Sequence, residues 1–210
     1  MEELQASELG TREYWDNRYK EEIANFKDHG DPGEIWFGED IVERIMKWIK
    51  KNVSITKNSK FLDVGCGNGM FLIELAVQGY TNLHGIDYSE DAIILAKSIA
   101  QKQDFQIQYS TCNILERLEG QFDIIHDKGT YDAISLNANI QEYRIKYLDN
   151  VHKGLNNDGF FIITSCNWTK DELDQQFQNY FVCVDNVPTP QFKFGGKTGN
   201  IVTSLVYKKL

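Results

Sequence analysis

The sequence predicts a doubly wound α/β fold, in which a mostly parallel sheet of seven strands carries helices on both faces and includes an antiparallel final strand. From residue 60 onward, short apolar runs alternate with helical stretches, and this order is typical of a parallel sheet. The last two apolar runs differ, because a loop around Pro188 to Gly199 joins them directly. We therefore expect five parallel strands followed by an antiparallel hairpin at the edge of the sheet.

Two helices are expected before the first strand, at residues 12–26 and 39–51. In the second, apolar residues recur at helical spacing: Ile41, Val42, Ile45, Trp48 and Ile49. Acidic residues at its start and lysines at its end complement the helix dipole. This helix therefore has one face that packs against the core.

The alternation of strands and helices begins with a strand at Phe61–Val64, a helix at Met70–Val77, a strand at Leu83–Ile86 and a helix that Ser89 caps. Further strands are predicted at residues 105–109, 122–126, 159–164, 180–184 and 201–207, with another helix at 140–152. In an open sheet of this kind, ligands bind beyond the carboxyl ends of the strands. The loops after the strands are where functional residues are expected.

Length and composition indicate one globular domain. The chain has 210 residues, of which 41% are hydrophobic and 25% charged, and these values are ordinary for a soluble protein. We expect a flexible N-terminus over residues 1–10 and a single domain over residues 11–210. Within that domain, residues 11–58 form a helical extension and residues 59–210 form the core that contains the sheet.

The charge balance bears on partners and location. Acidic residues outnumber basic ones by 31 to 22, which gives a net charge of −9, so nucleic acid is a poor candidate and a basic protein is favoured. No signal peptide or apolar stretch of 18 residues is present, which predicts a cytoplasmic or nuclear protein without a membrane span. The four cysteines, Cys66, Cys112, Cys166 and Cys183, match neither metal-ligand nor disulfide spacing, so we expect reduced thiols and no metal.

A glycine-rich turn follows the first strand. Gly65, Gly67 and Gly69 stand at alternate positions between that strand and the next helix, where the missing Cβ atoms let the backbone approach a ligand. Asp63 precedes the turn, and Asp87 ends the next strand 24 residues later. A carboxylate at this second position can accept hydrogen bonds from both ribose hydroxyls. An ordinary tight turn without a ligand is the alternative for the glycines alone.

Two nucleotide-like ligands compete for this turn. A nicotinamide cofactor would need the spacing Gly-x-Gly-x-x-Gly and a diphosphate at the helix N-terminus. Here the spacing is Gly-x-Gly-x-Gly, and Asp63 would place a negative charge beside the diphosphate. The ammonium of an amino acid suits Asp63 better. A nucleoside joined to an amino acid points to S-adenosylmethionine.

The string Asp63-Val-Gly65-Cys-Gly67-Asn-Gly69, followed by Gly85-Ile-Asp87, resembles the signature of seven-strand (class I) S-adenosylmethionine-dependent methyltransferases over residues 60–210. The resemblance implies a Rossmann-like methyltransferase fold. It implies that the three glycines flank the methionine part of the cofactor, that Asp63 lies near its amino group and that Asp87 binds its ribose. Tyr88 would pack against adenine. After the third strand this sequence has Asn113 and Ile114 where the family usually has an acidic residue, and they would contact the adenine.

Further strings narrow the resemblance. The segment His126-Asp127-Lys128-Gly129-Thr130-Tyr131-Asp132 resembles a branch of protein-lysine methyltransferases, and residues 13–19 resemble the N-terminal helix of that branch. Residues 33–38, 164–169 and 188–196 look like the lysine methyltransferases that modify translation elongation factor 1-alpha. This implies an enzyme whose partner is that folded protein, and we expect it to be a monomer.

The chemistry of the reaction suggests catalytic candidates. Transfer to an amine requires that the lysine lose its proton, and at pH 7 only about 0.04% of free lysine is neutral. Asp127 is predicted to orient the ammonium or to receive its proton through water. Tyr131 and Trp168 are placed with it as catalytic residues, and Trp36 and Phe194 join them in an aromatic channel that binds the ammonium. Trp36 and Asp127 are also expected at the cofactor.

Alternatives remain open for these residues and for the whole chain. Asp127 could cap the end of a strand, and the aromatic residues could be core packing. The chain could be a small-molecule or RNA methyltransferase on the same fold, or a non-catalytic module that binds S-adenosylmethionine.

Overall fold

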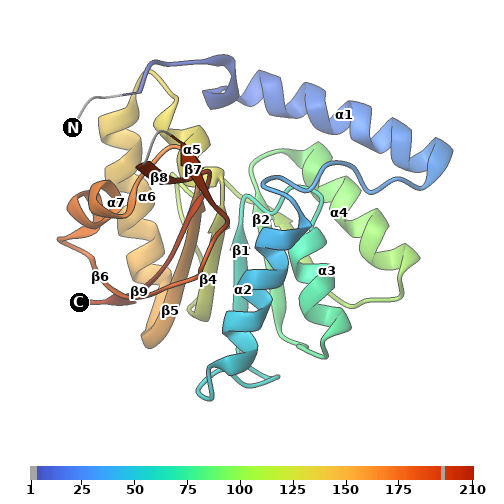
Figure 1. Ribbon diagram of the computed structural model, residues 1–210. Coiled ribbons are helices and arrows are strands. Elements are labelled where there is room, and N and C mark those ends of the chain that lie inside the picture. Colours follow the sequence, from blue (N-terminus) through green and yellow to red (C-terminus); the bar gives the residue numbers. More distant parts are fainter. Residues whose placement is uncertain (1–3, 195–196) are drawn as a thin grey trace.

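The computed structural model describes residues 4–194 and 197–210. In this part of the chain, seven strands form one sheet with helices on both faces (Figure 1). The helices α2 (Glu39–Lys51), α3 (Met70–Val77) and α4 (Glu90–Lys102) lie on one side, and α5 (Thr130–Ser135), α6 (Ile140–Gly154) and α7 (Lys170–Phe177) lie on the other. The expected doubly wound α/β architecture is confirmed.

The N-terminal helices pack onto the first of these faces. The helix α1 (Arg12–His29) begins at Thr11, whose hydroxyl accepts from Tyr14 N, and ends at Gly30 with a left-handed φ of 75°. Helix α2 has the predicted bounds, and its apolar stripe, including Ile45 and Ile49, is buried. Because Tyr19 and the α2 stripe share one hydrophobic cluster with β1 and α3, the helical extension and the sheet form a common core.

The first βαβα unit follows the sequence pattern closely. Strand β1 (Phe61–Val64) and helix α3 have the expected bounds, and strand β2 (Leu83–Asp87) extends one residue further than expected. Helix α4 starts at the Ser89 cap, whose hydroxyl accepts from Ala92 N. Local signals suffice here because each strand is a short apolar run and each helix has a clear start.

The later elements are β3 (Gln108–Thr111), β4 (Phe122–Lys128), β5 (Leu155–Ser165), β6 (Phe181–Asn186) and β9 (Thr203–Lys209). Each overlaps a predicted strand, but β3 starts three residues later and β5 four residues earlier than predicted. The short helices α5 and α7 were not expected. Helix α7 carries a capping box between Thr169 and Glu172, a signal that the sequence displays.

The strand order is β3-β2-β1-β4-β5-β9-β6. All neighbouring pairs are parallel except the two that β9 makes with β5 and β6. The final strand is therefore antiparallel as expected, and the expected hairpin of β6 and β9 at the edge of the sheet is confirmed, with β9 on the inner side and β6 as the edge strand. Leu205, Val206 and Tyr207 are buried, and an apolar strand of this kind needs a neighbour on each side.

The segment between β6 and β9 also differs from the expected loop. It contains a two-stranded antiparallel hairpin made of β7 (Gln191–Phe194) and β8 (Lys197–Asn200). The Phe194 side chain, which was expected in the aromatic channel, lies outside the described side chains.

The strand order reverses between β1 and β4, which is where a doubly wound sheet forms its ligand crevice. Two polypeptide segments meet above this point. Helix α1 passes over the carboxyl ends of the strands (Figure 1), and Ser7 N donates to Leu136 O after α5 at 3.1 Å. Residues 7–10, in the segment expected to be a flexible N-terminus, thus lie against α5. Among the described residues, no helix has both the length and the apolar character needed to cross a membrane.

Candidate active site

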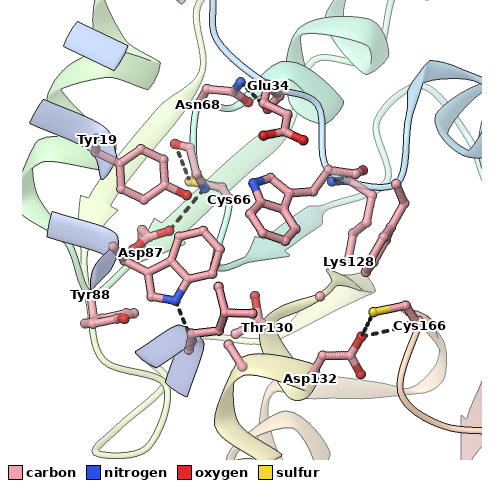
Figure 2. A pocket seen from close by; sticks show the side chains of 18 of the residues that line it. Tyr19, Glu34, Cys66, Asn68, Asp87, Tyr88, Lys128, Thr130, Asp132 and Cys166 are labelled. Carbon is pink, nitrogen blue, oxygen red and sulfur yellow. Dashed lines mark hydrogen bonds between the residues drawn. The ribbon is translucent and has the colours of Figure 1, made fainter. Parts of the chain in front are cut away.

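A cavity opens at the reversal point. Its floor is the turn after β1 and the end of β2, its far wall comes from residues after β4 and β5, and its roof comes from α1 and residues 34–37. Figure 2 shows Tyr19, Asp87 and Tyr88 on one side of this cavity and Lys128, Asp132 and Cys166 on the other. The lining contains both polar and aromatic groups.

The glycine turn forms a cradle at the floor. Gly65 and Gly67 line the cavity with left-handed φ values of 62° and 53°. A Cβ on Gly65 would overlap the Thr130 side chain, and one on Gly67 would lie 2.7 Å from the Tyr19 hydroxyl. Gly69 is also left-handed but lies behind the cavity against Tyr109. The turn therefore brings bare backbone to the cavity at two of the three predicted glycines.

Asp87 closes the same side. Its Oδ2 accepts from Gly67 N at 3.1 Å and its Oδ1 accepts from Ser89 N at 2.9 Å, so each oxygen keeps a lone pair for a further donor. Burial raises the pKa of this carboxyl to about 6. Tyr88 lies next to it, and the Arg12 guanidinium sits over the Tyr88 ring at 5.6 Å. This geometry suits a sugar diol beside a flat aromatic group.

Asp63 was expected beside the amino group of the cofactor, but it lies beneath the lining of the cavity. It is buried and does not line the cavity; its Oδ1 lies 2.7 Å from Nδ1 of His126, whose ring stacks on Phe71. His126 is itself fully buried.

The roof is tied to the rest of the molecule through main-chain carbonyls. The Asn68 amide donates to Pro32 O at 3.0 Å and to Glu34 O at 3.1 Å. Lys128 Nζ donates to Trp36 O at 3.0 Å, and burial lowers the pKa of this lysine. The Trp36 ring, predicted at the cofactor, lines the cavity and packs 5.0 Å from Trp15. Aromatic side chains thus cover the centre of the cavity.

The expected catalytic set lies beneath the cavity rather than in it. Asp127 is completely buried and accepts from Thr130 N at 2.9 Å, Tyr131 N at 3.1 Å and the Tyr147 hydroxyl at 2.5 Å. Burial raises the pKa of Asp127 to about 7. These contacts are those of a carboxylate near the end of β4 that caps the first turn of α5, whereas the alternative left open by the sequence was a cap of the strand end.

Tyr131 and Trp168 are likewise core residues. The Tyr131 ring packs against Tyr147 and Phe177, and its hydroxyl donates to Gln176 Oε1 at 2.5 Å. Trp168 is 3% exposed, with the Arg144 guanidinium over its ring at 4.6 Å. Neither side chain lines the cavity, so neither contacts the space where a ligand would lie.

The residues expected after β3 also lie elsewhere. Asn113 lines a separate groove along β2 and β3, which shares Tyr88 with the cavity, and its Oδ1 accepts from Leu115 N at 3.0 Å. Ile114 is buried in the hydrophobic cluster of the α6 face. Tyr88 therefore lines both the cavity and the groove that contains Asn113, whereas Ile114 is part of neither lining.

Several cavity residues were not singled out from the sequence: Tyr19, Asn68, Lys128, Thr130, Asp132 and Cys166. All six belong to strings whose resemblance was recognised, but a string does not tell which of its members face the cavity. Within the described residues, no cluster of three or more metal-ligating side chains is found.

The residues present fit S-adenosylmethionine. A Cβ-free turn, a carboxylate with free lone pairs and aromatic rings meet in one cavity at the switch point of the sheet. A ribose requires the carboxylate, and an amino-acid tail requires backbone groups that can approach it closely. The fit is made by this chain's Asp87, Gly65 and Gly67.

Comparison with known proteins places the fold in context. A family model described as "Methyltransferase domain" matches residues 55–209. Magnesium protoporphyrin IX methyltransferase from Synechocystis, solved with bound SAM, superposes with a TM-score of 0.70 over 98% of this chain and 99% of that chain, at 16% identity. The N-methyltransferase NodS from Bradyrhizobium japonicum gives a TM-score of 0.68 over 93% and 98%, at 17% identity. At these identities the likeness concerns the fold.

Sequence relatives are much nearer. EEF1A lysine methyltransferase 2 from Danio rerio is 47% identical over 99% of this chain and 91% of its own length, and the Homo sapiens protein of that name is 46% identical over 97% and 88%. Protein-lysine N-methyltransferase efm4 from Schizosaccharomyces pombe is 39% identical over 99% and 97%. With a family match over most of the chain and relatives that span nearly all of it, this chain belongs to the class I methyltransferases, in the protein-lysine N-methyltransferase subfamily of these relatives.

Proposed function

We propose that this protein transfers methyl groups from S-adenosylmethionine to a lysine side chain of translation elongation factor 1-alpha. The observation that carries this proposal is the extent of the match to the two EEF1A lysine methyltransferase 2 relatives, whose names specify that substrate. It covers 97–99% of this chain and therefore includes the N-terminal segment that roofs the cavity, not only the sheet.

When bound, S-adenosylmethionine supplies an electrophilic methyl carbon on its sulfonium sulfur. The residues of this chain bind and orient it: Asp87 accepts from the ribose hydroxyls, and the backbone of Gly65 and Gly67 lies against the methionine part. Tyr88 and Trp36 each contribute an aromatic surface to the cavity. Fixing two reactants in this way can contribute on the order of 7–11 kcal/mol to catalysis.

The far side of the cavity receives the lysine. The aromatic side chains of Trp36 and Phe37 exclude water there, and a cavity of low polarity lowers the pKa of an ammonium that enters it. Lowering the pKa of a lysine from about 10.4 to about 8 corresponds to roughly 3.3 kcal/mol. Asp127, Tyr131 and Trp168 support this wall from below by holding α5 and the turn after β5.

The net charge of the chain bears on which partners it binds. We propose a monomer in the cytoplasm whose partner is the folded elongation factor, with no direct role for nucleic acid or membrane. A net charge of −9 supports the choice of a protein partner over nucleic acid, because it repels nucleic acid and attracts basic protein surfaces.

The test is incubation of the purified protein with isotopically labelled S-adenosylmethionine and purified elongation factor 1-alpha, followed by mass spectrometry of the factor. We expect label on a lysine of the factor, and no label with an Asp87→Ala variant. If the wild type binds the cofactor and yet transfers no label, the proposed substrate is wrong.

A further inference from the structure

Asp132 is a buried carboxylate on the far side of the cavity. It stands in α5, lines the cavity and is 4% exposed. The turn after β5 holds it in place: the Ser165 hydroxyl donates to Oδ1 at 2.5 Å, Cys166 N donates to Oδ2 at 2.8 Å, and the Cys166 thiol lies 3.4 Å from Oδ2. Figure 2 shows the contacts with Cys166 as dashed lines.

These donors, and the Asn167 backbone N–H that also contacts the carboxylate, are neutral. Across residues 4–194 and 197–210, no lysine, arginine or histidine forms an ion pair with Asp132. The nearby Lys128 donates to Trp36 O instead. A buried carboxylate without a cation is unusual, because burial penalises its charged form and raises its pKa, as it does here. None of its donors carries the positive charge with which a buried carboxylate is usually paired.

The other carboxylates of the cavity are already engaged. Arg18 forms ion pairs with Glu22 at 3.3 Å and with Glu34 at 3.1 Å. Asp87 accepts from two backbone N–H groups on the opposite side, where the cofactor is proposed to bind. Among the carboxylates that line the cavity, Asp132 is therefore the one with which a cation entering from the far side would pair.

We propose that Asp132 recognises the acceptor by pairing with the ammonium group of the incoming lysine, so that a cationic side chain is selected over a neutral one. The inference rests on the proposed function and specifies which residue reads the charge of its substrate. The methylene stem of the lysine then lies along Phe37, which lines the same part of the cavity. Asp132 acts here in substrate recognition: its charge favours the ammonium form, so the pairing precedes the loss of the proton, which the exclusion of water by Trp36 and Phe37 favours.

The first test compares Asp132→Asn with the wild type. The substitution keeps the size of the side chain and an oxygen that can accept from Cys166 N, but it removes the charge. A hydrogen bond between charged groups contributes enough that we expect kcat/KM for the elongation factor to fall by roughly 10- to 150-fold. We expect the Kd of S-adenosylhomocysteine to stay within about threefold, because Asp132 is remote from Asp87.

A matched control separates recognition from support. Asp123 in β4 is also held by neutral donors, Lys60 N and the Asn156 amide, each at 2.8 Å, but it does not line the cavity. Asp123→Asn should leave kcat/KM within about threefold. If it lowers kcat/KM as much as Asp132→Asn does, the effect of Asp132 is structural and the proposal is overturned.

A binding cycle provides a readout that does not depend on turnover. The lysine that the wild type methylates is identified by mass spectrometry and replaced by glutamine in the factor. Binding of both factors to the enzyme loaded with S-adenosylhomocysteine is then measured by surface plasmon resonance. We expect the wild type to prefer the lysine form by at least tenfold and Asp132→Asn to lose most of that preference.

The outcomes distinguish this role from the proposed function. If the wild type labels no lysine of the factor, the proposed substrate fails and this role of Asp132 fails with it. If the wild type labels the factor but Asp132→Asn prefers lysine over glutamine as strongly as the wild type does, only the role of Asp132 is overturned.

Discussion

Two glycines with the same backbone conformation but different surroundings allow a sharp test of the cradle. Gly65 and Gly79 both have a left-handed φ, 62° and 83°. A Cβ on Gly65 would overlap Thr130, whereas a Cβ on Gly79 meets no atom within 4 Å. Replacing each by alanine therefore adds the same backbone strain, and only Gly65→Ala adds a collision.

The magnitudes follow from these two contributions. The left-handed conformation disfavours alanine by about 1–2 kcal/mol at either position, and the stiffer unfolded chain offsets about 0.4–1 kcal/mol of this. At Gly65 the added Cβ also displaces the Thr130 hydroxyl, which donates to Val64 O at 2.8 Å, and such overpacking costs about 1–3 kcal/mol. We expect a loss of about 1 kcal/mol in unfolding free energy for Gly79→Ala and about 2–4 kcal/mol for Gly65→Ala.

Urea unfolding measures the stability of each variant, and calorimetry measures its affinity for S-adenosylhomocysteine. Because Gly65 lines the cavity and Gly79 does not, Gly65→Ala should also weaken cofactor binding by at least tenfold, and Gly79→Ala should leave it unchanged within twofold. If both variants lose the same stability and both bind S-adenosylhomocysteine as the wild type does, the claim that Gly65 brings bare backbone to the cofactor is wrong.

Three other predictions concern the floor, the support and the roof of the cavity. Asp87 has a pKa of about 6 in the folded protein, above its unfolded value, so by itself it favours folding below about pH 4 and loses this contribution as the pH rises through 6. Ribose hydroxyls bound to Asp87 favour its ionised form, so calorimetry should show tighter binding of S-adenosylhomocysteine at pH 7.5 than at pH 5.5. Asp87→Asn should flatten this pH dependence of the affinity. If the variant keeps the pH dependence of the wild type, Asp87 is not the group responsible. Asp127→Ala should lower the unfolding free energy by about 2–4 kcal/mol, because the buried Tyr147 hydroxyl and two N–H groups lose their acceptor, while the affinity of the folded protein stays within threefold. Asn68→Ala should increase the dissociation rate of S-adenosylhomocysteine in stopped flow, because the roof loses two hydrogen bonds; an identical rate would show that these bonds do not hold the roof.

The fold could be predicted wherever the local pattern decides the structure. The run at Phe61–Val64 and the stripe of α2 give correct bounds, since a buried strand and an amphipathic helix each have a recognisable period. The position of β9 could not be predicted in this way. Whether the last strand lies inside the sheet or at its edge depends on how β6 and β9 compete for β5, which is a long-range choice.

The site was predicted in part for a related reason. Asp87 and two of the three glycines line the cavity because the end of a strand and a tight turn fix where they point. Asp127 and Lys128 are neighbours at the end of β4, and adjacent strand residues face opposite sides of a sheet. In the structure, Asp127 points toward Tyr147 in the core and Lys128 points toward Trp36 at the cavity. On α5, Tyr131 likewise packs in the core and Asp132 lines the cavity. A sequence string cannot show which neighbour faces the ligand.

Titration of the purified protein with S-adenosylhomocysteine in a calorimeter tests the central claim most directly. If the cavity beside Asp87 holds the cofactor, the titration shows uptake of one equivalent, and Asp87→Ala abolishes it while remaining folded by circular dichroism. Absence of uptake by well-folded wild-type protein, or undiminished uptake by the variant, would contradict the assignment of this cavity.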